Sequence, residues 1–251
     1  MKQYLIILFA CVASGLVMAQ DLQTNDLSFF DPDANKEEVY KFHVEYRLEG
    51  GYVQHWQHGK KKESRMYLNG GHIGMTFDFM LPYRFSVQTG LLYTIAYGKT
   101  SQKWGVVNEE ESYAMPNTVQ HRVTEHWLAV PIRAYYNIKL WKKLNLFFYG
   151  GPQLMIGLAE IDNIKNNLPA IATQKYRDMG VKLEKYNRFK DELYPVNIQI
   201  GIGGGIEWDS YRLQAGYDFG VNNQIKHQQY DKQHMWEWSW YVSFAYKLPI
   251  H

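Results

Sequence analysis

Eight segments in which apolar and polar residues alternate are the feature that most constrains the fold of this chain. In residues 196–208, for example, an isoleucine or other apolar residue at every second position except Gly204 alternates with polar residues and glycines. A period of two places successive side chains on opposite faces of a β-strand. The other alternating segments are 42–52, 73–81, 85–97, 128–139, 144–158, 211–219 and 236–248.

The connections between these segments are alternately long and short. Short turns are predicted at Pro82-Tyr83, at Trp141 to Lys143 and at Asp209-Ser210, whereas the long connections cover 57–68, 98–121, 160–193 and 222–233. Short periplasmic turns and long external loops are typical of outer-membrane barrels. We therefore predict an all-β fold, an eight-stranded antiparallel up-and-down transmembrane β-barrel.

Two local features modify this prediction. Pro131 lies within the fourth alternating segment and has no N–H to donate, so a bulge or a break in pairing is expected there. In the third long connection, apolar residues from Tyr176 to Leu193 recur at steps of three and four, which predicts a short external helix despite Gly180.

Alternation alone also fits a soluble barrel with an apolar cavity, so the inward face needs its own argument. The apolar face carries large residues and no charge in the middle of any strand, as lipid contact requires. The polar face carries many glycines and equal numbers of acids and bases, which suits a crowded interior without an open channel. The predicted structural network of the lumen comprises Glu45, Arg47, Glu49, Asp78, Arg84, Arg133, Lys139, Glu207, Arg212, Asp218, Glu237 and Lys247.

Aromatic residues make up 16% of the chain, with 20 Tyr and 8 Trp, and many fall near the ends of the predicted strands. Rings at these positions suit the two membrane–water boundaries of a barrel. Trp141 and Trp208 are assigned to the periplasmic girdle, and Tyr97, Trp127 and Trp236 to the external girdle.

The N-terminus resembles a secretory signal peptide, with Lys2 before an apolar run that ends at Val17-Met18-Ala19. The predicted organisation is a signal peptide at 1–19, a periplasmic leader at 20–39 and an outer-membrane barrel at 40–248. A lipoprotein site at Cys11 is the alternative. Cys11 is the only cysteine, so cleavage after Ala19 would leave neither a disulfide nor a thiol nucleophile.

Other chemical signals have simple structural interpretations. His55 with His58, and His121 with His126, suggest metal ligands, but no nearby spacing completes a site, so we interpret them as surface histidines. The glycine run 201–205 lies within a strand and is interpreted as lumen packing. A lipid hydrolase would need Ser239 or Ser243 near His234 and Glu237, yet their parity places Ser239 and Glu237 in the lumen. Lys60 to Lys62 and Glu109 to Glu111 are interpreted as solvated loop tips, the lysines with lipopolysaccharide phosphates as an alternative target.

Several motifs resemble the Bacteroidetes outer-membrane β-barrel family, which includes the PorT-like proteins. They are residues 128–136, the Tyr149 to Pro152 motif, residues 201–207 and the closing segment 242–247. The resemblance implies an eight-stranded outer-membrane barrel, some members of which take part in type IX protein secretion, and it offers no catalytic residues. The chain departs from such barrels after Lys247, where Leu248 to His251 replace the usual terminal aromatic residue.

The resulting hypothesis is a non-enzymatic outer-membrane barrel, without a cofactor or a metal, that supports an envelope process such as protein secretion or assembly. A binding module that uses its external loops for lipopolysaccharide or a partner protein is the second hypothesis, and a lipid-modifying enzyme is the third. The expected partners are outer-membrane lipid, lipopolysaccharide and other envelope or secretion proteins. A net charge of only +2 argues against nucleic acid.

Overall fold

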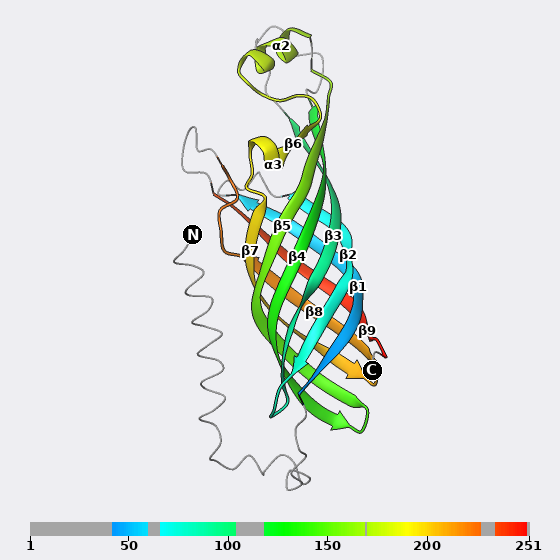
Figure 1. Cartoon of the computed structure of the whole chain (residues 1–251). Helices are drawn as coiled ribbons and strands as arrows, with labels where there is room; N and C mark the ends of the chain where they lie inside the picture. The colour runs from blue at the N-terminus through cyan, green and yellow to red at the C-terminus, as the bar shows by residue number, and fades with distance from the viewer. Residues whose placement is uncertain (1–41, 60–65, 104–117, 169, 227–233, 250–251) are drawn as a thin grey trace. The chain divides into compact units, whose positions relative to one another are not determined.

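The computed structural model describes residues 42–59, 66–103, 118–168, 170–226 and 234–249. The predicted signal peptide, the leader and the charged triplets at 60–62 and 109–111 lie outside these residues. Within them, eight long antiparallel strands pair in a closed ring in the order β4-β3-β2-β1-β9-β8-β7-β5, and β4 also pairs with β5 (Figure 1). The strands are β1 (His43–Gly59), β2 (Met66–Met80), β3 (Phe85–Lys103), β4 (Thr118–Trp141), β5 (Leu144–Asn166), β7 (Val196–Trp208), β8 (Tyr211–Gly220) and β9 (Met235–Lys247).

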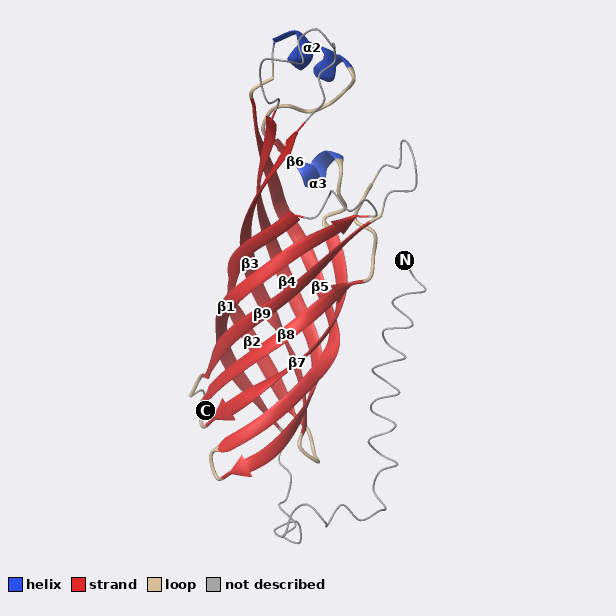
Figure 2. Cartoon of the chain, turned by 180° about the vertical axis from the view of Figure 1, so that it is seen from behind, coloured by secondary structure: helices blue, strands red, loops and turns tan. Residues whose placement is uncertain are grey.

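Tight turns join the strands at one end of the barrel, here called the turn end. The turns lie between Met80 and Phe85, between Trp141 and Leu144, and between Trp208 and Tyr211, as predicted. Asp209 has φ of 57°, so the two-residue connection from β7 to β8 uses the left-handed backbone that such hairpins require. The opposite end carries the long connections and is here called the loop end (Figure 2).

The polar face of the alternating strands points into the barrel, as predicted. Charged residues such as Arg47, Asp78 and Arg212 are almost completely buried, whereas Ile73, Leu91 and other large apolar residues lie exposed on the outside. A soluble protein would not leave so large an apolar surface uncovered, and a bilayer would cover it. The structure thus has the polarity of a membrane barrel and not that of a soluble barrel with an apolar cavity.

The break in pairing predicted at Pro131 is present, and no bulge accompanies it. On the side of β3, Thr89 pairs with Ile132 and Leu92 pairs with Ala129, in one register. The residues between these two pairs are not paired across the strands. A proline in the middle of a sheet removes a donor, so one or more ladder hydrogen bonds are lost without changing the alignment of the strands.

At the loop end the polarity of the wall reverses, which the sequence analysis did not predict. The connections predicted at 98–121 and 160–193 are in part strand, because β3 continues to Lys103, β4 begins at Thr118 and β5 continues to Asn166. In this region the inward face carries a buried apolar cluster of Met66, Leu68, Ala96 and Val123, beside the buried acids Glu160 and Asp162 of β5. The outward face is polar and includes Lys99, Ser101, Gln120, Arg122, Asn163 and Lys165.

Strands of 24 residues in β4 and 23 in β5 are more than twice as long as the roughly 9–11 residues that cross a bilayer. Together with the reversed polarity, this length indicates that the loop-end parts of β3, β4 and β5 lie outside the membrane. We call them the extension. Figure 1 shows the green strands β4 and β5 rising beyond the ring toward α2.

Helical structure is present in the third long connection, but the single helix predicted between Tyr176 and Leu193 is wrong. The chain forms α2 (Ala170–Asp178), the two-residue β6 (Tyr186–Asn187), which pairs with β5, and α3 (Arg188–Asp191). Gly180 has φ of +79°, so it ends the helical region after α2 instead of continuing it.

No helix in the described ranges is both long enough and apolar enough to cross a membrane.

Candidate functional site: the barrel lumen and its loop end

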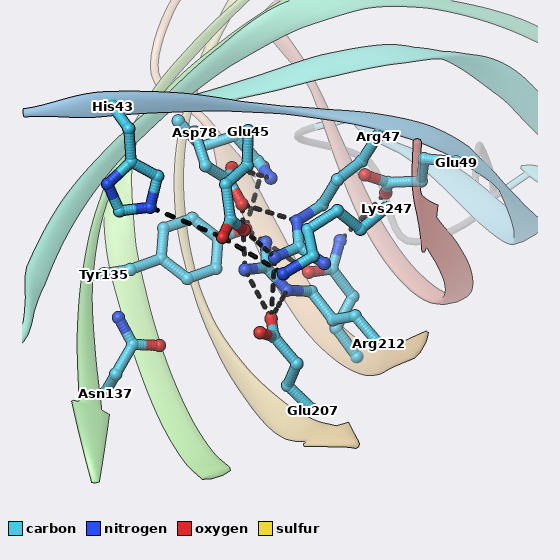
Figure 3. Close-up of polar contacts among 12 residues, drawn as sticks. His43, Glu45, Arg47, Glu49, Asp78, Tyr135, Asn137, Glu207, Arg212 and Lys247 are labelled. Atoms are coloured by element: carbon cyan, nitrogen blue, oxygen red, sulfur yellow. Dashed lines mark hydrogen bonds and ion pairs between the residues drawn. The ribbon is translucent and has the colours of Figure 1, made fainter. Parts of the chain in front are cut away.

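A network of buried ion pairs fills the turn-end half of the lumen (Figure 3). Oδ2 of Asp78 accepts from Nε of Arg47 at 2.7 Å and lies 2.8 Å from Nη2 of Arg212. Glu207 bridges the same two guanidinium groups, at 3.0 Å from Arg47 and 2.8 Å from Arg212. Gln88 donates to the second oxygen of Asp78 at 2.8 Å. These contacts join β1, β2, β7 and β8 across the lumen.

Glu45 pairs with both Arg47 and Lys247 at the edge of this network. Above it, Glu49 accepts hydrogen bonds from Gln214 and Ser243, both at 2.8 Å. Arg133 donates to Gln153 and Asp218 and also contacts the hydroxyl of Tyr241. At this level the lumen contains a small cavity of about 30 Å³, enough for about two water molecules. Such a filled interior offers no wide path for a solute.

Ten of the twelve residues predicted for the lumen network lie inside the barrel, and two do not. Arg84 is exposed in the turn between β2 and β3, where its φ is 68°, and Lys139 is exposed near the turn end of β4. Both lie where the strands leave the barrel wall, so alternation no longer directs their side chains inward. Sequence reasoning missed the neutral members Gln88, Tyr135 and Gln214, although all three have inward parity.

A second buried cluster lies nearer the loop end, where His55 faces Glu125 and Glu237. Nδ1 of His55 is 2.5 Å from Oε1 of Glu125 and 3.4 Å from Oε1 of Glu237. His55 is 2% exposed and both carboxylates are fully buried. The interpretation of His55 as a surface residue is therefore wrong, because β1 remains a strand through this position and turns the side chain inward. Glu125 was missed because β4 begins earlier than predicted.

The segment around α3 closes the lumen above this cluster. Phe189 packs edge-on against Trp127, with ring centroids 4.9 Å apart, within a cluster that also contains Leu193 and Met235. Trp127 is fully buried, so its assignment to the external aromatic girdle is wrong: it lies on the inward face of β4. We call this cluster the plug.

Arg188 ties the plug to the barrel wall. Its Nη1 lies 2.5 Å from Oε1 of Glu160 and 3.1 Å from Oε1 of Gln57, and Gln57 itself donates to Glu160. Burial alone would lower the pKa of Arg188, but the carboxylates of Glu160 and Glu192 hold the pKa above its ordinary value. Arg188 therefore stays charged and fixes α3 over the mouth of the lumen.

Substitution Gly157→Ala tests how tightly the plug is packed. A Cβ at this position would lie 2.4 Å from the ring of Phe189 and 3.0 Å from that of Trp127, so one ring must move. We expect a loss of about 1–3 kcal/mol in the free energy of unfolding, as is typical for overpacking. Hydrogen exchange should rise in residues 183–193 and not at the turn end. Unchanged exchange in that segment would show that the plug is loosely seated.

A row of basic side chains crosses the outward face of the extension. Lys99 of β3 pairs directly with Arg122 of β4, and Lys165 lies two residues beyond Asn163, the residue paired with Arg122 on β5. Like charges opposite one another destabilise a sheet. No acidic side chain is present on the outward face among the described residues 97–101, 120–124 and 161–165 of these strands. We call Lys99, Arg122 and Lys165 the basic row.

The other chemical signals have structural roles. Ser243 is bonded to Glu49, Glu237 faces His55, and the ring of His234 stacks on Trp236, so the hydrolase set is not assembled. Gly203 and Gly216 face the hydroxyl of Tyr149, where an added Cβ would lie about 2 Å from the oxygen. The interpretation of the glycine run as lumen packing therefore agrees with these contacts.

An antiparallel ring of eight strands with an apolar exterior and a charged, filled interior defines a membrane-spanning β-barrel. A family model described as the outer membrane protein beta-barrel domain matches residues 40–226. The chain belongs to this family and is an outer-membrane protein. The match does not extend to the Bacteroidetes or PorT-like assignment, which stays a prediction.

Solved structures of outer-membrane barrels are similar over most of their length. Neisserial surface protein A has 8% identity and a TM-score of 0.41, covering 81% of this chain and 97% of that chain. OprG from Pseudomonas aeruginosa has 10% identity and a TM-score of 0.38, covering 82% and 97%. Ail of Yersinia pestis, in complex with a heparin analogue, has 10% identity and a TM-score of 0.34, covering 82% and 99%. No curated protein matches the sequence.

Proposed function

We propose that this protein is a non-enzymatic outer-membrane barrel that binds phosphate-bearing lipopolysaccharide on the outside of the cell through its extension. The basic row is the observation that carries this proposal. Neighbouring cations on one face of a sheet do not stabilise the sheet, because like charges repel. Three of them close together on adjacent strands are therefore suited to binding an external anion.

The position of the basic row relative to the membrane boundary supports the same proposal. On β3, the exposed aromatic Tyr97 directly precedes Lys99 on the outward face, and rings of this kind lie at the membrane–water boundary. The cations therefore lie just above that boundary, at the level of lipid headgroup phosphates. The filled lumen argues against diffusive transport as the main activity.

The triple variant Lys99→Gln, Arg122→Gln, Lys165→Gln tests the proposal. Because each basic residue near an anionic surface contributes about 1 kcal/mol, we expect binding of purified lipopolysaccharide to the barrel in nanodiscs to weaken about 10- to 100-fold. Raising the salt concentration should reduce the difference between the wild type and the variant.

A matched variant at the turn end controls for charge alone. Lys139, Lys142 and Lys143 are exposed there, and their replacement by glutamine removes the same charge from the opposite side of the membrane. This control should bind lipopolysaccharide as the wild type does. Equal weakening in both variants, or none in either, would contradict the proposal.

The role in secretion or assembly rests on the family resemblance. Replacing residues 168–180, which include α2, by a glycine-serine segment of equal length tests whether a partner protein uses this loop. The segment lies beyond the described pairs of β5, so the barrel should fold normally. A secretion defect with intact lipopolysaccharide binding would assign that role to the loop and separate it from the basic row.

A further inference from the structure

The cluster of His55, Glu125 and Glu237 has an unusual balance of charges for the interior of a barrel. Two carboxylates share one imidazole, and all three residues are buried. The buried carboxylate of Glu160, which is paired with Glu125 across β4 and β5, already pairs with Arg188 and accepts from Gln57. If both carboxylates are ionised, one negative charge has no partner even when His55 is protonated, and burial makes such a charge costly.

The oxygens of the two carboxylates also lack hydrogen bonds. Neither oxygen of Glu125 and neither oxygen of Glu237 has a hydrogen-bond partner among the residues that the structure describes. Nδ1 of His55 likewise lacks hydrogen-bond geometry, although it lies 2.5 Å from Glu125. Elsewhere in the lumen, comparable carboxylates are satisfied: Asp78 receives Arg47 and Gln88, and Glu49 receives Gln214 and Ser243. Other buried polar atoms without a partner occur in the barrel, including one oxygen each of Glu160 and Asp162, but among the described carboxylates only Glu125 and Glu237 have both oxygens buried and unpartnered.

The geometry suits a metal ion at the centre of the three groups. One ligand atom from each residue lies within 4.8 Å of the other two. Ligands about 2.0–2.2 Å from a Zn²⁺ ion in tetrahedral geometry are separated by a little over 3 Å, and rotation of the Glu125 carboxylate would open its contact with His55 to that distance. An imidazole nitrogen with two carboxylate oxygens favours a divalent transition metal over Ca²⁺ or Mg²⁺.

We propose that His55, Glu125 and Glu237 bind one divalent transition-metal ion, with Zn²⁺ as the best fit, inside the loop-end part of the lumen. The ligands come from β1, β4 and β9, so the ion would join three strands beneath the plug. Its two positive charges would compensate both carboxylates and occupy the oxygens that lack donors. The site is independent of the basic row, which lies on the outer face.

Metal binding to the refolded wild-type barrel tests the proposal first. The protein is folded in detergent with Zn²⁺ or Co²⁺ so that the ion need not enter a closed lumen, and free metal is then removed by dialysis. We expect one equivalent of retained metal and visible Co²⁺ absorption bands typical of nitrogen and oxygen ligands. Absence of both the equivalent and the bands would overturn the proposal, and this arm requires no substitution.

The variants Glu125→Gln and Glu237→Gln test the ligands. Each keeps the shape of the side chain and removes one buried charge, and folding is checked by the shift of the unheated band on a gel. We expect Zn²⁺ affinity, measured against a competing chelator, to fall at least about 100-fold in each variant. The controls are His58→Gln on the outer face and His121→Gln, whose Nδ1 lies 2.7 Å from Asp162; both should bind Zn²⁺ as the wild type does. Unchanged affinity in both glutamine variants, or loss only in His121→Gln, would overturn the assignment.

Discussion

Substitution Asp78→Asn is expected to lower the free energy of unfolding by about 3–5 kcal/mol, because it leaves buried cations without their partner. Asp78 is fully buried between Arg47 and Arg212, which lie 2.7 and 2.8 Å from one of its oxygens. Asparagine has nearly the same shape, so lost packing contributes little. Glu207 would still bridge both guanidinium groups, and Glu45 would still pair with Arg47.

Urea titration of the barrel folded into lipid vesicles measures this effect, with the folded fraction read from the unheated gel band. Asp209→Asn is the matched control, because Asp209 pairs with Lys143 at 3.3 Å on the exposed turn end. Asparagine tolerates the positive φ of that position, and exposed pairs contribute about 0–1 kcal/mol. Similar losses in the two variants would show that the lumen network is solvated and not a structural core.

Alternation predicted the barrel and the inward direction of its charges because both follow from local parity. Parity assigned Arg47, Asp78 and Arg212 to the lumen without knowledge of which strands would be neighbours. It could not predict that Asp78 meets both arginines, since these contacts join strands that are far apart in the sequence. Arg84 shows the opposite limit, because a turn with positive φ interrupts parity one residue before β3 begins.

The loop-end cluster was missed for a related reason. His55 and Glu125 lie near or beyond the predicted ends of their strands, where polar residues on both faces resemble loop sequence. Parity extended backwards from Leu128 does place Glu125 and Trp127 inward. The sequence does carry a signal that β4 begins earlier, because Val119 and Val123 alternate with polar neighbours. This signal was missed because inward residues were expected to be polar, and these two are apolar.

The helix was mispredicted because three- and four-residue spacing was counted across Gly180. The apolar residues on either side of that glycine pack separately: Leu183 and Phe189 are buried, whereas Met179 is exposed. A left-handed glycine separates them into two elements with different directions. Phe189 is thus a plug residue, a role that depends on its contact with Trp127 and that helical spacing does not reveal.

The reversal of polarity leads to a second large effect, which differs along a single strand. Leu91 and Ser101 are both exposed on the outward face of β3, but Leu91 lies midway between the outward aromatics Phe85 and Tyr97, and Ser101 lies beyond Tyr97. Leu91→Arg is expected to lower the free energy of unfolding in vesicles by about 2–4 kcal/mol, the cost of arginine at the bilayer midplane. Ser101→Arg should change it by less than about 1 kcal/mol, because water surrounds that position.

A charge on the inward face of the extension should also destabilise the barrel. Val123 is buried in the apolar cluster of the extension, so Val123→Asp should destabilise the barrel, whereas the lumen lower down accommodates many charges. Urea titration of the three variants under one set of conditions compares them directly. Equal losses in the free energy of unfolding for Leu91→Arg and Ser101→Arg would place the extension in the bilayer. The basic row would then not lie at the level of the lipid headgroup phosphates, and this support for lipopolysaccharide binding would be lost. A small loss for Ser101→Arg with a large loss for Val123→Asp would identify the extension as an extracellular β-structure with its own apolar core, and the basic row as a surface that faces the cell exterior.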